Sequence, residues 1–284
     1  MVAEAPGQFE PRGAGAPSQV RPIDVLVATY NSAQTLEETL TSVRAHIPVH
    51  CLIVVDREST DGTPEIARRH QARLVRDSVG LGFARNAALQ AADTDPVLFV
   101  DSDVCVVKAG FFAEAFAEFE RPRTAAVVGA SVGHAFRYGL PLGLTVVGRE
   151  WALGAGIPDA VQSRETYYLQ LEARRRKERV RYIPDAMVHR GTYRKDPHWP
   201  EFQGAAIRAT SGWNPRELAY AAVVIQLMHM NSRRPKNVLY SPIFFGKLLR
   251  GFLAPTRWGR LERVPLPVTP PWTAGGPPRG DVER

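Results

Sequence analysis

The sequence has little cysteine and no long hydrophobic run, and each absence excludes a class of protein. Its 284 residues include two cysteines, Cys51 and Cys105, which are too few for a disulfide framework and favour a reducing compartment. The longest apolar stretch, residues 219–230, falls short of the roughly 20 residues that span a bilayer and contains Gln226 and His229. The N-terminus lacks the basic start and apolar core of a secretory signal. We therefore expect a cytoplasmic protein.

The rest of the composition is that of a globular protein with a surplus of positive charge. Apolar residues make up 44%, aromatic residues 9% and charged residues 23%, which excludes a disordered, collagen-like or coiled-coil chain. The net charge of +7 admits nucleic acid, an anionic membrane surface or phosphorylated substrates as partners. Much of the surplus lies in residues 172–181 and 233–263. Because no aromatic platform accompanies the first cluster, we expect no nucleic-acid partner.

Apolar patterning predicts an α/β domain between two tails. Residues 1–22 and 264–284 are rich in proline and glycine, and we expect them to be disordered. Four apolar segments have the length and composition of buried strands, namely residues 23–30, 51–56, 73–77 and 96–103. Amphipathic stretches typical of helices separate them. Continuously apolar strands that alternate with helices predict a parallel sheet covered by helices on both faces.

The second half is less regular. Strands are predicted at residues 125–132 and 181–189 and a helix at 163–178, whereas 133–159 has the glycine density of loops. We place the α/β domain at residues 23–215 and a helical, basic, amphipathic extension at 216–263.

Polar groups gather where the predicted strands end. They are Thr29, Tyr30 and Asn31 after the first strand, Asp56 after the second, and Asp101, Ser102 and Asp103 after the fourth. Ligands of open parallel sheets bind beyond the carboxyl ends of the strands. Two carboxylates within three residues repel each other unless a cation lies between them, and a hard divalent cation that also holds phosphate oxygens is the simplest solution.

Four segments in order resemble family 2 glycosyltransferases of the GT-A fold. They are ATYN at 28–31, VVDRESTDGT at 54–63, GLGFARNAAL at 80–89 and FVDSDV at 99–104. The resemblance covers about residues 23–192. It implies a Rossmann-like, mostly parallel sheet with a nucleotide-sugar donor lying across the strand ends, and Mn²⁺ or Mg²⁺ as cofactor.

The resemblance also implies roles for individual residues. Thr29, Tyr30 and Asn31 would edge the base pocket, Asp56 would contact the base or ribose, Arg85 would lie toward the nucleotide, and Asp101 and Ser102 would face the ribose. Asp103 would ligate the metal on the diphosphate, and the strand RYIPDAMVHRG would supply His189 as a second ligand. Asp101 with Asp103 as a helix cap, Arg85 as a surface charge and His189 as an ordinary strand residue are the structural alternatives.

Two positions depart from the family pattern. The usual catalytic Asp, which takes the proton of the acceptor hydroxyl, aligns with Thr166. Either Glu165, one residue earlier, is the base of an inverting displacement, or the chain has lost catalysis and is a binding subunit. Glu165 can also simply stabilise a helix N-terminus. Arg57, where the family has an acid or a small polar residue, can pair with Asp56 or reach a phosphate. A nucleotidyltransferase is a further alternative, but the glycine-rich basic loop that it needs is missing after the first strand.

Residues 240–258 form one more motif. Apolar residues recur there in adjacent pairs at helical spacing, Phe244 with Phe245, Leu248 with Leu249, and Phe252 with Leu253, among lysine and arginine. Such a helix lies in a membrane interface or packs on its own domain. The first reading predicts contact with a membrane surface through residues 240–260, a peripheral location on the inner membrane face and a lipid-linked or membrane-bound acceptor.

Overall fold

The computed structural model describes residues 21–133, 139–191, 198–231 and 235–255, and side chains at 225 and 227–238 are outside the description. Almost all of the two expected tails therefore lies outside the described residues, as does the end of the 240–260 segment.

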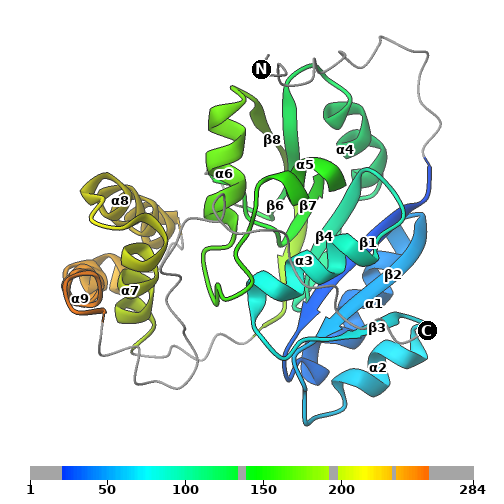
Figure 1. Ribbon diagram of the computed structural model, residues 1–284, viewed down its shortest axis with the longest axis horizontal. Helices are drawn as coiled ribbons and strands as arrows, with labels where there is room; N and C mark the ends of the chain where they lie inside the picture. The colour runs from blue at the N-terminus through cyan, green and yellow to red at the C-terminus, as the bar shows by residue number, and fades with distance from the viewer. Residues whose placement is uncertain (1–20, 134–138, 192–197, 232–234, 256–284) are drawn as a thin grey trace, which may run out of the picture.

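One eight-stranded sheet forms the centre of the molecule (Figure 1). Its strands, in spatial order, are β3 (Arg73–Arg76), β2 (Val49–Asp56), β1 (Ile23–Thr29), β4 (Val97–Asp101), β7 (Leu144–Val147), β6 (Thr124–Ser131), β8 (Arg179–His189) and β5 (Val104–Val106). The first four are mutually parallel, and β6 is parallel to β8. β7 runs antiparallel to both of its neighbours, and β5 runs antiparallel to β8. The predicted mostly parallel α/β sheet is confirmed.

Helices cover both faces of this sheet, because successive strand side chains point to opposite sides. One core lies under α1 (Ala33–His46), α2 (Thr63–Arg69) and α4 (Phe111–Phe119) and includes Val25 and Val27 of β1. The other lies under α3 (Leu81–Ala91), α5 (Arg149–Gly154) and α6 (Thr166–Arg175) and includes Leu26. The parts of β1, β2 and β4 that lie between these cores, residues 25–28, 52–55 and 97–100, contain apolar residues alone, because both of their faces are buried.

Two elements lie where the sequence predicted loops. Residues 133–159 contain β7 and α5. β7 has only four residues between glycines, too short for a periodic signal, but all four side chains are buried because the strand is inserted between β4 and β6. Tertiary pairing therefore decided the conformation of this segment.

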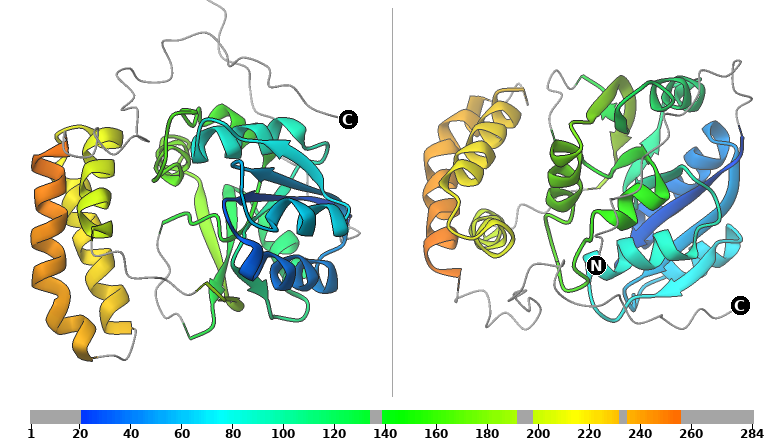
Figure 2. Two further views of the ribbon diagram at one scale, coloured as in Figure 1. Left: turned by 90° about the horizontal axis from the view of Figure 1, so that it is seen from below. Right: turned by 45° about the horizontal axis from the view of Figure 1, so that its top comes forward.

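Three helices form a separate layer beside α6 (Figure 2). They are α7 (Trp199–Ser211), α8 (Pro215–Asn231) and α9 (Pro235–Leu253), and Ile207, Leu218, Leu248 and Phe252 form their shared core. The layer begins at Trp199, earlier than residue 216, where we place the helical extension from sequence. In the described part of the chain, no helix combines the length and apolarity needed to cross a membrane.

The apolar pairs of α9 divide between two environments. Phe244, Leu248 and Phe252 are buried within the helical layer, whereas Phe245 and Leu253 remain exposed. One half of the predicted apolar face therefore packs on its own domain, and the other half is available to a partner.

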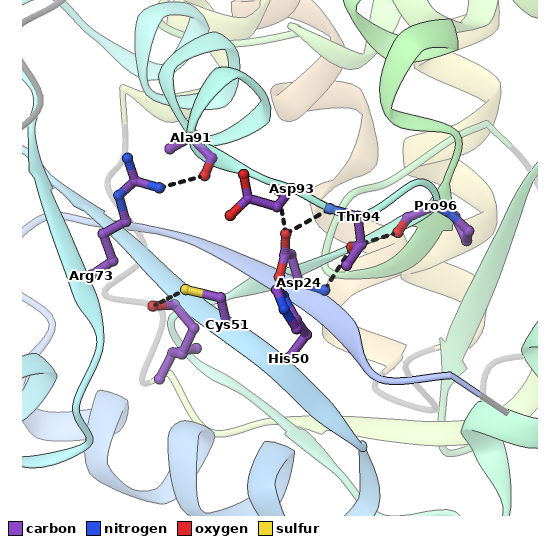
Figure 3. A network of polar contacts seen from close by, with 9 residues as sticks. Asp24, His50, Cys51, Arg73, Ala91, Asp93, Thr94 and Pro96 are labelled. Atoms are coloured by element: carbon purple, nitrogen blue, oxygen red, sulfur yellow. Dashed lines mark hydrogen bonds and ion pairs between the residues drawn. The ribbon is translucent and has the colours of Figure 1, made fainter.

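The edge of the sheet at which β1 begins is fixed by a buried carboxylate (Figure 3). Asp24 accepts hydrogen bonds from the amides of Asp93 and Thr94, at 2.5 and 2.9 Å, and its other oxygen lies 2.6 Å from Nδ1 of His50. This network joins the first residues of β1 and β2 to the turn before β4. The opposite ends of the same strands are then held in register, with Thr29 beside Asp56 and Ala28 beside Asp101.

Candidate active site

The ends of β1 and β2 are locked together by one buried carboxylate. Asp56 accepts hydrogen bonds from the hydroxyls of Thr29 and Ser59, both at 2.7 Å, and from the amide of Ser59 at 2.9 Å. Asn31 closes the loop because its side-chain oxygen accepts the amide of Thr60 at 2.9 Å. Its φ of 47° is left-handed, a conformation that asparagine tolerates better than most residues. Three of the predicted donor residues, Thr29, Asn31 and Asp56, are thus brought together.

Tyr30 and Ser102 directly follow the ends of β1 and β4. The Tyr30 side chain is half exposed at the strand end. The Ser102 hydroxyl lies 2.9 Å from that of Ser32, and the Ser102 carbonyl accepts hydroxyl hydrogen bonds from Thr35 and Thr39 of α1. These bonds fix the turn between Asp101 and Asp103 against the N-terminal half of α1.

A buried arginine lies between two acids at the end of β4. Arg85 of α3 is only 4% exposed, donates from Nη2 to Asp101 Oδ1 at 2.9 Å and has Nε 3.7 Å from Glu165 Oε1. Its guanidinium also lies over the ring of Phe99. Among the described residues, Nε and Nη1 of Arg85 have no hydrogen-bond partner. The buried guanidinium therefore joins the end of β4 to the start of α6.

Glu165 ends up inside this cluster because α6 begins beside it. Burial raises the pKa of Glu165 above its ordinary value, although the positive charge of Arg85 opposes the shift. A raised pKa makes the ionised carboxylate a stronger base, which suits proton transfer near neutral pH. Thr166 lies on the wall of a cavity described below.

Asp103 and His189 form a second acidic and basic pair at the sheet edge. β5 pairs with β8 so that Val104 lies opposite His189, which brings His189 Nδ1 to 3.5 Å from Asp103 Oδ1. The hydrogen bond that His189 donates to the Asp103 carboxylate raises the pKa of His189. Gly191 also lies against this pair, because a Cβ there would overlap the Asp103 carboxylate.

The donor set of this pair fits a divalent metal that is held partly by substrate. One carboxylate and one imidazole suit Mn²⁺, and Mg²⁺ is commonly bound by one or two carboxylates plus phosphate oxygens. Within the described residues no group of three or more His, Cys, Asp or Glu side chains forms a metal cluster. The remaining ligands would therefore come from phosphate and water.

Residues 158–162 pack against the start of α3, and the sequence analysis did not predict this contact. The Gly82 amide donates to the carbonyl of Val161 at 2.7 Å, and a Cβ at Gly82 would overlap the carbonyl of Pro158. Gln162 accepts from Arg57 Nη1 at 2.5 Å. Arg57 thus bonds to Gln162, and the pairing with Asp56 weighed from the sequence is not what the structure shows. The second glycine of GLGF was the available signal, because it marks a close backbone approach.

A cavity of about 390 Å³ opens beside His189. His189 and Thr166 line one side, and α7, α8 and α9 line the other. No local sequence pattern signals this cavity, because its walls come from six separate elements, β6, β8, α6, α7, α8 and α9.

Comparisons with known proteins agree with this architecture. Residues 24–142 match the family model "Glycosyl transferase family 2". Over 89 residues the chain is 33% identical to the putative teichuronic acid biosynthesis glycosyltransferase TuaG of Bacillus subtilis, a match covering 28% of this chain and 35% of that protein. Over 89 residues it is 38% identical to the poly(ribitol-phosphate) beta-N-acetylglucosaminyltransferase TarS of Staphylococcus aureus, covering 28% and 16%. The chain thus spans only about a third or less of these curated relatives.

Solved structures extend the likeness over most of the chain. The mannosyltransferase PcManGT from Pyrobaculum calidifontis, in complex with GDP-Man and Mn²⁺, superposes with a TM-score of 0.63 at 20% identity, covering 87% of this chain and 90% of that one. Glucosyl-3-phosphoglycerate synthase from Mycobacterium tuberculosis, in complex with Mn²⁺, UDP and phosphoglyceric acid, superposes with a TM-score of 0.53 at 21% identity, covering 66% and 78%. Residues 24–142 therefore match the family 2 glycosyltransferase model, and the chain shares the GT-A fold of these solved glycosyltransferases.

Proposed function

We propose that the protein is a metal-dependent, inverting glycosyltransferase that moves a sugar from a nucleoside diphosphate to a hydroxyl acceptor. The observation that carries this proposal is the pair formed by Asp103 and His189. Asp103 lies two residues after Asp101, which belongs to the cluster of Arg85, Asp101 and Glu165. The family match and the structural relatives that bind a nucleotide with Mn²⁺ support it.

The donor would lie across the ends of β1, β2 and β4. The lock formed by Thr29, Asn31 and Asp56 gives the base and ribose a rigid edge, with Tyr30 exposed beside it. Asp101, which Arg85 holds at 2.9 Å, and Ser102 would face the same edge. Asp103 and His189 would hold Mn²⁺ or Mg²⁺, which when bound neutralises charge on the leaving diphosphate.

The transfer is a single displacement in which atoms and charges balance. The acceptor oxygen bonds to the anomeric carbon from the face opposite the diphosphate, and the bond from that carbon to the diphosphate oxygen breaks. The acceptor proton passes to a carboxylate oxygen of Glu165, and the diphosphate leaves with the electron pair. A positioned base of this kind contributes a factor of roughly 10² to 10⁴ in rate.

The alternative is a glycosyltransferase-like subunit that binds nucleotide without transferring sugar. Thr166 favours it, because threonine cannot accept a proton at neutral pH and the side chain stands where the family has its base. In this case Glu165 serves only to neutralise Arg85, 3.7 Å away.

The test is thermal unfolding with UDP and GDP, each with and without Mn²⁺, followed by a transfer or hydrolysis assay with the corresponding nucleotide sugars. A ligand that binds only the native state raises the melting temperature. We expect a Mn²⁺-dependent rise with one nucleotide, its loss in Asp103→Ala, and its retention in Glu165→Gln with turnover lower by about 10² to 10⁴.

Asp93→Ala is the matched control, because Asp93 is exposed at the opposite edge of the sheet and should leave both measurements unchanged. Equal affinity for metal and nucleotide in Asp103→Ala and the parent would end the metal proposal. Equal turnover in Glu165→Gln would reject Glu165 as the base, and nucleotide binding without turnover in the parent would favour the binding subunit.

We further propose that the helical layer contacts an anionic membrane surface, where the acceptor would reside. Leu239, Ile243, Phe245 and Leu253 of α9 are exposed on the described surface, and Lys247 and Arg250 lie among them. Apolar side chains that enter the headgroup region and cations that meet anionic lipid act together in such contacts.

A further inference from the structure

The cavity beside His189 has one wall from the glycosyltransferase domain and one from the helical layer. β6, β8 and α6 contribute Gly129, Tyr182 and Tyr167, and α7 and α9 contribute Ile207 and Leu248. Its volume of about 390 Å³ lies within the range of about 300–1,000 Å³ that is typical of small-molecule sites. The site is therefore large enough to hold part of a substrate.

The lining of this cavity is mostly apolar, with some polar groups. The polar side chains are His189, Thr166, Arg164, Ser131, Gln170 and Gln203, of which His189 contacts Asp103. Most of the other lining side chains are aliphatic or aromatic, among them Leu140, Tyr167, Met187, Trp199, Ile207 and Leu248. A hydroxyl placed at Thr166, next along the chain to Glu165, would therefore have mostly apolar side chains behind it.

A second apolar cavity lies on the far side of Leu248. It has a volume of about 420 Å³ between α8 and α9, and Val223, Phe244 and Phe245 line it. Leu248 lines both cavities and is fully buried, so this side chain separates them. Val223 is 57% exposed, which places the outer cavity at the protein surface. Apolar side chains thus extend from the exposed face of α8 and α9 to the metal pair.

We propose that the acceptor is an amphiphile whose apolar part fills the cavity between α6 and the helical layer and whose hydroxyl lies at the start of α6, where Thr166 of the cavity wall follows Glu165. This inference rests on the proposed glycosyl transfer and names the class of acceptor. A polar group that lies against Leu140, Met187 and Ile207 would lose water without gaining hydrogen bonds to these three side chains, whereas burial of an apolar part against them is favourable.

Two adjacent valines of α8 allow a matched test. Val224 lines the cavity beside His189, which we call the inner cavity. Val223 lines the second cavity, between α8 and α9, and is mostly exposed. Val224→Trp fills the proposed acceptor site, and Val223→Trp makes the same chemical change outside it. Because Val224 is not fully buried, the larger side chain can enter the cavity without displacing the core of the helical layer.

The probes are octyl, phenyl and methyl β-glucoside, with affinities measured by calorimetry below the micelle concentration of the octyl compound. For the parent protein we expect octyl β-glucoside to bind at least about tenfold more tightly than the methyl compound, a difference that burial of two methylenes already supplies. Val224→Trp should abolish this preference, and Val223→Trp should keep it within about twofold. A preference for the phenyl over the octyl compound would identify the apolar part as aromatic rather than an alkyl chain.

Equal affinity for the octyl and methyl compounds in the parent would overturn the inference, as would equal weakening by the two tryptophan variants. The Mn²⁺-dependent rise in melting temperature with nucleotide is measured on the same samples and reports folding of the donor site. If that rise is absent from the parent while the chain-length preference is present, the proposed function fails but the apolar site stands. If the rise is present and the preference absent, only the acceptor class is wrong.

Discussion

Asp24 shows how one buried carboxylate stabilises the fold far from the proposed chemistry. Burial by itself raises the pKa of Asp24, but the hydrogen bonds from His50, Thr94 and Asp93 together outweigh it and leave the pKa below its ordinary value. An aspartate whose folded pKa is lower than its unfolded pKa stabilises the folded state above the unfolded value of about 3.9. That contribution is lost as the pH falls through the lower folded value.

We therefore predict a pH-dependent cost for Asp24→Asn. The free energy of unfolding of the variant should be lower than that of the parent by a constant amount between about pH 5 and pH 7. Below about pH 4 the difference should shrink, because Asp24 of the parent becomes protonated, first in the unfolded and then in the folded state. Urea unfolding at several pH values measures this difference in the free energy of unfolding. A difference that persists unchanged to the lowest pH at which the parent folds would show that the charge of Asp24 has no part in stability.

Residues at the proposed active site differ in how far the sequence revealed them. Asp101 and Asp103 follow an apolar strand and were expected at the sheet edge on that ground alone. The contact between Arg85 and Glu165 joins residues 80 positions apart, and no local pattern encodes it. It arises because α3 and α6 cover the same face of the sheet.

At the scale of elements, glycine decides how closely α7 and α9 approach each other. A Cβ on Gly251 would overlap the carbonyl of Glu201, and a Cβ on Gly204 would overlap the carbonyl of Leu248. Each helix thus uses a glycine to contact the backbone of the other. A Cβ on Gly246, also in α9, would meet nothing within 4 Å.

The two glycines of α9 should therefore respond oppositely to alanine. Gly251→Ala forces the helices apart and should lower the free energy of unfolding by about 1–3 kcal/mol. Gly246→Ala only reduces the freedom of the unfolded chain and should raise it by about 0.5–1 kcal/mol. Chemical denaturation followed by circular dichroism measures both. The same sign for the two variants would contradict a close helix crossing at Gly251.

For the whole molecule, an ion pair joins the glycosyltransferase domain to the helical layer. Arg164, just before α6, donates to Glu217 of α8 at 2.9 Å, and their side chains are only 17% and 11% exposed. The desolvation of Arg164 lowers its pKa, and Glu217 opposes that shift. Because Arg164 also lines the inner cavity, this pair fixes the distance between the two walls of the proposed acceptor site.

We predict that Glu217→Gln destabilises the protein by about 3–5 kcal/mol, because it leaves a buried guanidinium without a counter-charge. Arg174→Ala is the control. Arg174 lies 3.5 Å from the same carboxylate but is 57% exposed, so its loss should cost no more than about 1 kcal/mol. Urea unfolding compares the two variants. If they are equally stable, the link between the domain and the helical layer does not depend on the buried pair.

The sequence by itself determined β1 to β4 with the helices between them, the edge at which the acids that end β2 and β4 lie, and the resemblance to family 2 glycosyltransferases. These properties are local, because apolar period, strand length and acids at strand ends can be read within short segments. Only the tertiary structure decided β7, the site contact between Arg85 and Glu165, and the cavity behind His189. Each depends on segments that are distant along the chain. These segments meet because the burial of apolar surface is favourable whatever the separation of the residues in the sequence.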